Sequence, residues 1–94
     1  MNSLLNNIES TIISECIKAA EVGFIVDSNF EYSNILDDIK VSVKGIMYGD
    51  DITFRRGSIT DIEVTSKVHI LKEEDIEEFK NNIKDKFSDY ANKI

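Results

Sequence analysis

The chain is expected to fold as one α+β domain spanning residues 1–94. Its predicted elements are an N-terminal helix, an antiparallel meander of three or four strands, and a C-terminal amphipathic helix. Two observations predict this. Apolar residues recur with a helical period at both ends of the chain and with a period of two between residues 39 and 71. The length of 94 residues suits a single hydrophobic core.

The first helix is expected over residues 3–22, with Asn2 or Ser3 as its cap and Gly23 at its end. Its apolar side chains cover a wider arc than the stripe of a typical surface helix. This width has two interpretations: the helix packs beneath residues 24–38, or it contacts a partner helix or a second copy of the chain. The residues assigned to such a self-association or partner contact are Glu9, Ile13 and Ile17.

The middle of the chain is expected to form strands. Residues 24–27 read as a short strand followed by a turn at 27–29, and residues 30–36 fit a strand, a loop or one short helical turn. From residue 39 the side chains alternate, so that Val41 and Val43 share one face of a strand.

Polar residues mark the expected turns of the meander. Turns are predicted at 37–38, 49–51 and 56–58, where Asp, Gly and Ser gather. Most apolar residues between 59 and 71 fall on alternate positions and so share one face. This pattern fits either one long strand or a hairpin that folds at 65–67.

The last helix is expected over residues 73–92, where acidic residues crowd the first turns and lysines come later, as the helix dipole favours. Its apolar side chains should close the core against the sheet. The predicted core consists of Leu5, Ile8, Ile12, Val41, Val43, Ile62, Val64, Ile70, Ile76, Phe79, Ile83 and Phe87.

One region resembles a known kind of fold. Residues 49–59, then Val68-His69-Ile70 and Glu74-Asp75-Ile76, look like the middle strands of small barrels of the KOW or Tudor kind. In those barrels a Gly-Asp turn opens a strand that turns again at a glycine. The resemblance covers about a quarter of the chain and implies a small-barrel-like sheet. It carries over no functional residue.

The residue types argue against catalysis and metal binding. Cys16 is the only cysteine and His69 the only histidine, which is too few for a zinc site, and Cys16 falls in the apolar stripe of the first helix. Residues 27–38 imitate half of a calcium loop, but Tyr32 stands where that loop needs glycine. We therefore expect no enzyme activity, no metal and no cofactor.

The charge balance limits the classes of partner that the chain is expected to bind. Acidic residues outnumber basic ones by 18 to 11, for a net charge of −7, which disfavours nucleic acid and anionic membranes. No apolar run approaches the length of a membrane span, and a lone cysteine cannot form an internal disulfide. A protein partner and a cytoplasmic location are the expectations.

Two charged groups are candidate sites. The acidic residues of the last strand and of the last helix are predicted to form one negative, protein-binding face; they are Asp61, Glu63, Glu73, Glu74, Glu77 and Glu78. The two arginines of the chain, Arg55 and Arg56, are adjacent and are the candidate contact for a phosphate or carboxylate.

The sequence thus favours a non-enzymatic, acidic protein-binding module, either a monomer or a homodimer. Its most specific version is a phage or bacterial modulator or inhibitor that acts on a nucleic-acid-handling target. The source class rests on a composition rich in Ile, Asn and Lys. One alternative is a small-barrel-like nucleic-acid- or peptide-binding module using Arg55, Arg56 and Lys67. Another is a phage structural or enzyme-accessory subunit.

Overall fold

The computed structural model describes residues 2–21, 28–51 and 54–92. Its elements follow the order α1 (Ser3–Glu21), β1 (Ser28–Leu36), β2 (Ile39–Asp51), β3 (Phe54–Ser66) and α2 (Glu73–Ala91). The three strands form one antiparallel sheet in the order β1-β2-β3. The predicted α+β arrangement is therefore confirmed. The predicted strand at 24–27 and the predicted helix end at Gly23 lie outside the described residues.

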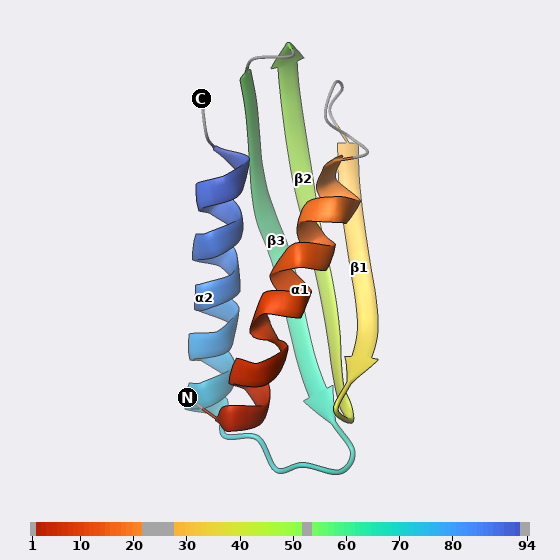
Figure 1. Ribbon diagram of the computed structural model, residues 1–94, viewed down its shortest axis with the longest axis vertical. Helices are drawn as coiled ribbons and strands as arrows, with labels where there is room; N and C mark the ends of the chain where they lie inside the picture. The colour runs from red at the N-terminus through yellow and green to blue at the C-terminus, as the bar shows by residue number, and fades with distance from the viewer. Residues whose placement is uncertain (1, 22–27, 52–53, 93–94) are drawn as a thin grey trace.

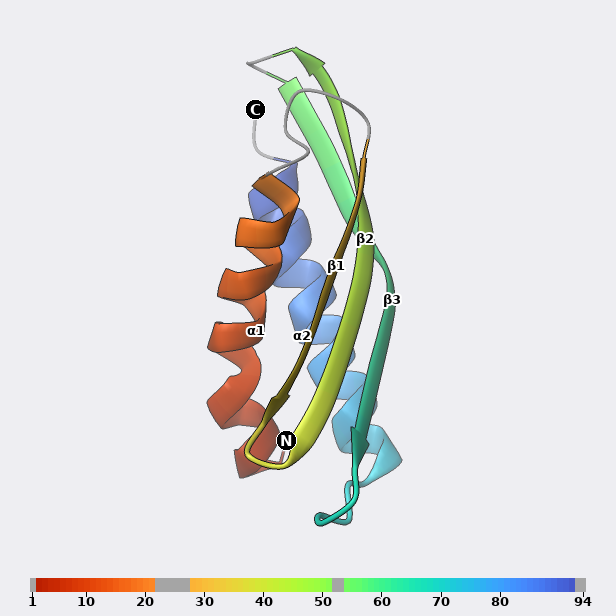
Figure 2. The same ribbon diagram turned by 90° about the vertical axis from the view of Figure 1, so that its right-hand side faces the viewer.

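Both helices lie on the same face of the sheet, and the other face is left uncovered (Figures 1 and 2). Helix α1 contacts β1 and β2, whereas α2 contacts β3 and α1. The molecule is elongated, measuring 44 × 19 × 17 Å along its principal axes. Among the described residues, β1 and β3 are the edge strands of this sheet.

The core fills the space between the helices and the sheet. Except for Ile70 and Ile76, every predicted core residue is buried. Ile76 is half-buried. The prediction for Ile70 was wrong: this side chain is 97% exposed. The reason is that β3 ends at Ser66, so the alternation of apolar residues beyond that point runs along a loop.

The strand boundaries correct two predicted turns. Residues 56–58 do not turn, because they lie inside β3 and pair with β2. Strand β2 also continues through the predicted turn at 49–51, and the connection to β3 falls at 52–53, outside the described residues. Residues 28–29, expected in a turn, begin β1. Long β-strands therefore run through glycines that resemble turn signals.

Close packing explains why Gly45 and Gly57 lie within strands. A Cβ atom on Gly45 would fall 2.2 Å from Cζ of Phe30, and one on Gly57 would fall 2.2 Å from Sδ of Met47. The ring of Phe30 thus lies directly over Gly45, with its centroid 5.1 Å from that of Phe87 on α2.

The turn between β1 and β2 is confirmed at Asp37 and Asp38. Both residues have positive φ values, 51° and 62°, as a two-residue hairpin turn of type I′ requires. Asp and Asn tolerate this left-handed conformation better than most residues. At the start of α1, the backbone N–H of Leu4 donates to Oδ1 of Asn2 at 2.8 Å, which confirms the predicted cap.

Candidate functional site

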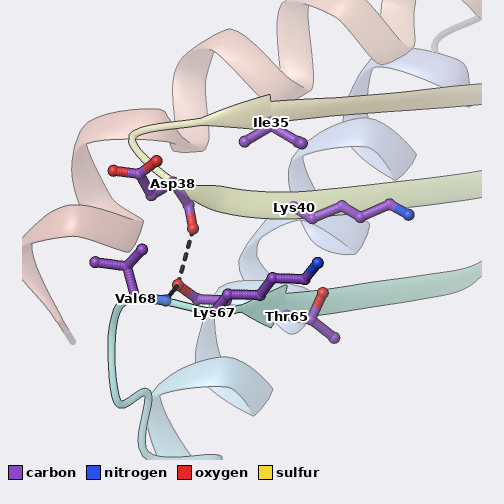
Figure 3. A pocket seen from close by; sticks show the side chains of 7 residues that line it. Ile35, Asp38, Lys40, Thr65, Lys67 and Val68 are labelled. Carbon is purple, nitrogen blue, oxygen red and sulfur yellow. Dashed lines mark hydrogen bonds between the residues drawn. The ribbon is translucent and has the colours of Figure 1, made fainter.

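A shallow cavity of about 370 Å³ lies on the uncovered face, at the end of the sheet where the β1–β2 turn meets the loop after β3. All three strands contribute to it, as does the loop between β3 and α2. Its lining residues are Ile35, Asp38, Lys40, Thr65, Ser66, Lys67 and Val68. Figure 3 shows these side chains.

One hydroxyl organises the base of this cavity. Oγ of Ser66 donates to the backbone oxygen of Asp38 at 2.8 Å. Oγ of Ser66 in turn accepts hydrogen bonds from the backbone N–H groups of Val68 at 3.2 Å and His69 at 3.0 Å. Three hydrogen bonds through one atom hold the loop after β3 against the β1–β2 turn.

His69 adds a second contact between the same two segments. Its Nε2 atom lies 3.1 Å from the backbone oxygen of Asp37. Because a carbonyl oxygen only accepts hydrogen bonds, Nε2 carries the proton and donates it. Together with the bonds of Ser66, this contact ties the loop after β3 to the β1–β2 turn.

Two lysines dominate the charge of the cavity. Lys40 on β2 and Lys67 after β3 are both exposed and both line the cavity, and in Figure 3 their side chains extend in the same direction. Among the described residues neither lysine has an ion-pair or hydrogen-bond partner. The carboxylate of Asp38 points away from both amino groups (Figure 3). Two unneutralised positive charges thus lie together on an acidic protein.

Apolar side chains surround these charges. Within the described part of the chain, three large hydrophobic residues are strongly exposed: Ile35 at 64%, Val68 at 67% and Ile70 at 97%. Ile35 and Val68 line the cavity, and Ile70 follows two residues later in the same loop. We call the whole region the loop-end surface, comprising Ile35, Lys40, Thr65, Lys67, Val68 and Ile70.

The predicted acidic residues are distributed over two layers. Asp61 and Glu63 pair with Lys44 and Ser42 of β2, and all four share the parity of the uncovered face. Glu73, Glu74, Glu77 and Glu78 lie on the first turns of α2, which covers the opposite face. The acidic residues on β3 therefore lie beside β2, where Lys44 stands between Asp61 and Glu31 of β1.

The predicted anion contact, Arg55 and Arg56, lies near the tip of the hairpin formed by β2 and β3. These arginines pair with Gly49 and Tyr48 in the backbone register, and their side chains are outside the described part of the structure. The backbone of this hairpin extends past the ends of both helices (Figure 1).

The residues predicted for self-association lie closer to the core than expected. Ile13 and Ile17 are half-buried and pack against the core. Glu9 is 7% exposed, and its Oε2 accepts a hydrogen bond from Nζ of Lys86 on α2 at 2.8 Å. Glu9 therefore links the two helices inside the fold instead of standing at the rim of an interface.

The remaining reactive groups are separated. Cys16 is fully buried, and burial, aided by the nearby Glu15 carboxylate, raises its pKa from 9.0 to about 12. A thiol with that pKa stays protonated at neutral pH and is a poor nucleophile. His69 is held at the far loop by the backbone oxygen of Asp37. In the described ranges no three His, Cys, Asp or Glu residues gather as metal ligands.

The loop-end surface is not among the sites that the sequence predicts. The alternation between residues 59 and 71 gives Val68 and Ile70 the same parity as the buried residues of β3, and Lys67 is a candidate only beside the arginines. A signal was present: Ile35 and Lys40 flank the 37–38 turn at positions that a two-residue hairpin pairs directly.

Comparison with protein-family models, with curated proteins and with solved structures finds no significant match to this chain. Over the described residues, neither helix is long and apolar enough to cross a membrane. The function must therefore be argued from the geometry of the chain itself.

Proposed function

We propose that this chain is a non-catalytic protein-binding domain and that the loop-end surface is its contact site. The observation that carries the proposal is the location of Ile35, Val68 and Ile70. These are the strongly exposed large hydrophobics of the described structure, and all three lie at one end of the molecule. Exposed apolar side chains that gather in one place, with polar groups at their edge, are typical of a protein-binding surface.

The preformed loop supports the same proposal. Ser66 and His69 fix the loop through four hydrogen bonds to backbone groups, so a partner would not have to order it. A surface that is already ordered loses less conformational entropy on binding. The narrower proposal, a phage or bacterial modulator of a basic, nucleic-acid-handling protein, is supported only by the net charge of −7 and by the acidic side chains.

Site-specific photo-crosslinking in cells of the source organism tests this proposal. A photoreactive amino acid would replace Thr65 or Ile70 on the loop-end surface, and Ser14 or Asn81 on the exposed side of the helices as controls. Samples would be treated with nuclease. We expect the same crosslinked protein from positions 65 and 70 and from neither control. Crosslinks from the helix positions alone, crosslinks to nucleic acid, or none from positions 65 and 70 would contradict the proposal.

A further inference from the structure

The loop-end surface combines features that select one kind of ligand. It offers two amino groups, from Lys40 and Lys67, and a hydroxyl from Thr65, all exposed. Ile35 and Val68 form apolar walls beside them. We propose, building on the protein-binding function above, that this cavity binds an acidic segment of a partner protein in which a carboxylate stands next to an aliphatic side chain.

Charge complementarity is the first argument. Among the described residues Lys40 and Lys67 have no acidic partner, although the chain contains 18 acidic residues. Like charges that line one cavity repel each other, and a bound carboxylate would relieve that repulsion. Ammonium groups and a hydroxyl can all donate hydrogen bonds to its oxygens.

The surrounding carboxylates argue against a nucleic-acid ligand. Further along the same face, Glu31 and Asp61 flank Lys44 on neighbouring strands, and Glu63 comes two residues after Asp61. A phosphate backbone that reached the two lysines would be repelled by these three acids as it continued along the sheet. A single carboxylate on a peptide does not extend into that region.

The position of the lining residues indicates how the segment lies. They come from all three strands, so the ligand rests across the uncovered face and contacts side chains. A peptide that extended the sheet would instead pair with the backbone of β1 or β3 at an edge. The acidic residues and the two lysines of the cavity occupy different parts of one face. A partner with complementary charges therefore docks in one orientation.

Titration of the isotope-labelled full chain, followed by amide chemical shifts, tests this inference. The probe is a short acetylated and amidated peptide with one Glu between two Leu residues, and the matched control peptide has Gln in place of Glu. We expect saturable shifts at Lys40, Thr65, Lys67 and Val68 with the first peptide. Binding of the Gln peptide should be at least about tenfold weaker.

A pair of double variants separates local from general charge effects. Lys40→Gln with Lys67→Gln should weaken binding of the Leu–Glu peptide by about tenfold. Lys18→Gln with Lys84→Gln removes the same charge from exposed positions on the helices and should change it by less than about twofold. Amide spectra without ligand confirm that each variant is folded.

Several results would overturn the inference. These are equal losses in the two double variants, shifts at other sites, or no saturable shift at millimolar peptide. Tighter, salt-sensitive binding of a short DNA or RNA oligonucleotide at the loop-end surface would assign the cavity to nucleic acid. If crosslinking from positions 65 and 70 still captures one protein, the protein-binding function stands and only the acidic ligand chemistry fails.

Discussion

The same three strands make both faces of the sheet. The two faces differ in whether their apolar side chains are buried in the core or exposed to solvent. Along β3, Ile62 and Val64 point toward the helices and are buried, whereas Asp61, Glu63 and Thr65 alternate with them and are exposed. On the covered face, apolar residues build the core. On the uncovered face, Ile35 is exposed and has no comparable role in folding. Apolar residues of the uncovered side are therefore not needed to build the core.

The largest effect should come from the covered side, where α2 closes the core. Phe79 is fully buried there. Replacing Phe79 with Ala removes most of the side chain and leaves a cavity, which should lower the free energy of unfolding by about 3–5 kcal/mol. Chemical denaturation measures this. A folded variant of unchanged stability would show that α2 does not dock as described.

Neighbouring residues on β3 test the two faces directly. Ile62→Ala should lower the free energy of unfolding by about 2–5 kcal/mol, because Ile62 is buried against the helices. Glu63→Ala, one residue further on the uncovered face, should change it by less than about 0.5 kcal/mol. Similar losses at the two positions would mean that the uncovered face is buried in solution.

The bond between the helices should have an intermediate effect. Lys86→Met leaves the buried carboxylate of Glu9 without its donor, which should cost about 1–3 kcal/mol. Adding Glu9→Met removes that unpaired charge and should restore most of the loss. The measurement is a double-mutant cycle by denaturation, and additive losses would argue that the two side chains do not interact.

The buried thiol should make stability depend on alkaline pH. The unfolded chain loses the Cys16 proton above pH 9.0, while the folded chain keeps it until about pH 12. The contribution of this thiol is therefore fully present below pH 9 and falls as pH rises, by up to about 1.4 kcal/mol per pH unit. Comparing wild type with Cys16→Ala at pH 8 and pH 10 isolates it. A difference between the two proteins that stays constant would contradict the pKa shift.

The smallest effect on stability should come from the loop-end surface. Val68→Ser with Ile70→Ser removes apolar surface that is already in water, so the free energy of unfolding should change by less than about 0.5 kcal/mol. With the photoreactive amino acid at position 65, the same double variant should lose the crosslinks that form when Val68 and Ile70 are intact. A large loss of stability would show that these side chains serve folding.

Hydrophobic periodicity predicted the buried faces of the elements better than turn residues predicted where the strands end. The buried faces of both helices and of β2 and β3 followed from periodicity, because Phe79, Ile83 and Val43 occupy positions that only one face can share. Strand ends did not follow. Gly57 reads as a turn residue, but contact with Met47 and Ala91 across the core requires its small size within a strand.

The candidate site was missed for a related reason. Val68 and Ile70 keep the parity of β3, and nothing in that pattern shows that the strand has ended at Ser66. The end depends on hydrogen bonds from Ser66 and His69 to the 37–38 turn, some thirty residues away in the chain. Local periodicity carries no information about such contacts, so the exposed Ile70 is predicted to lie in the core.

The bond from Lys86 to Glu9 also has a consequence for the order of folding. The two residues are 77 positions apart, whereas the β1–β2 hairpin closes through only two residues. Bringing distant segments together costs more chain entropy than closing a short turn. We therefore expect the hairpin to form before the rate-limiting barrier and the contact between the helices to form after it. Substitutions at the 37–38 turn would then slow folding, and substitutions at Lys86 would mainly speed unfolding.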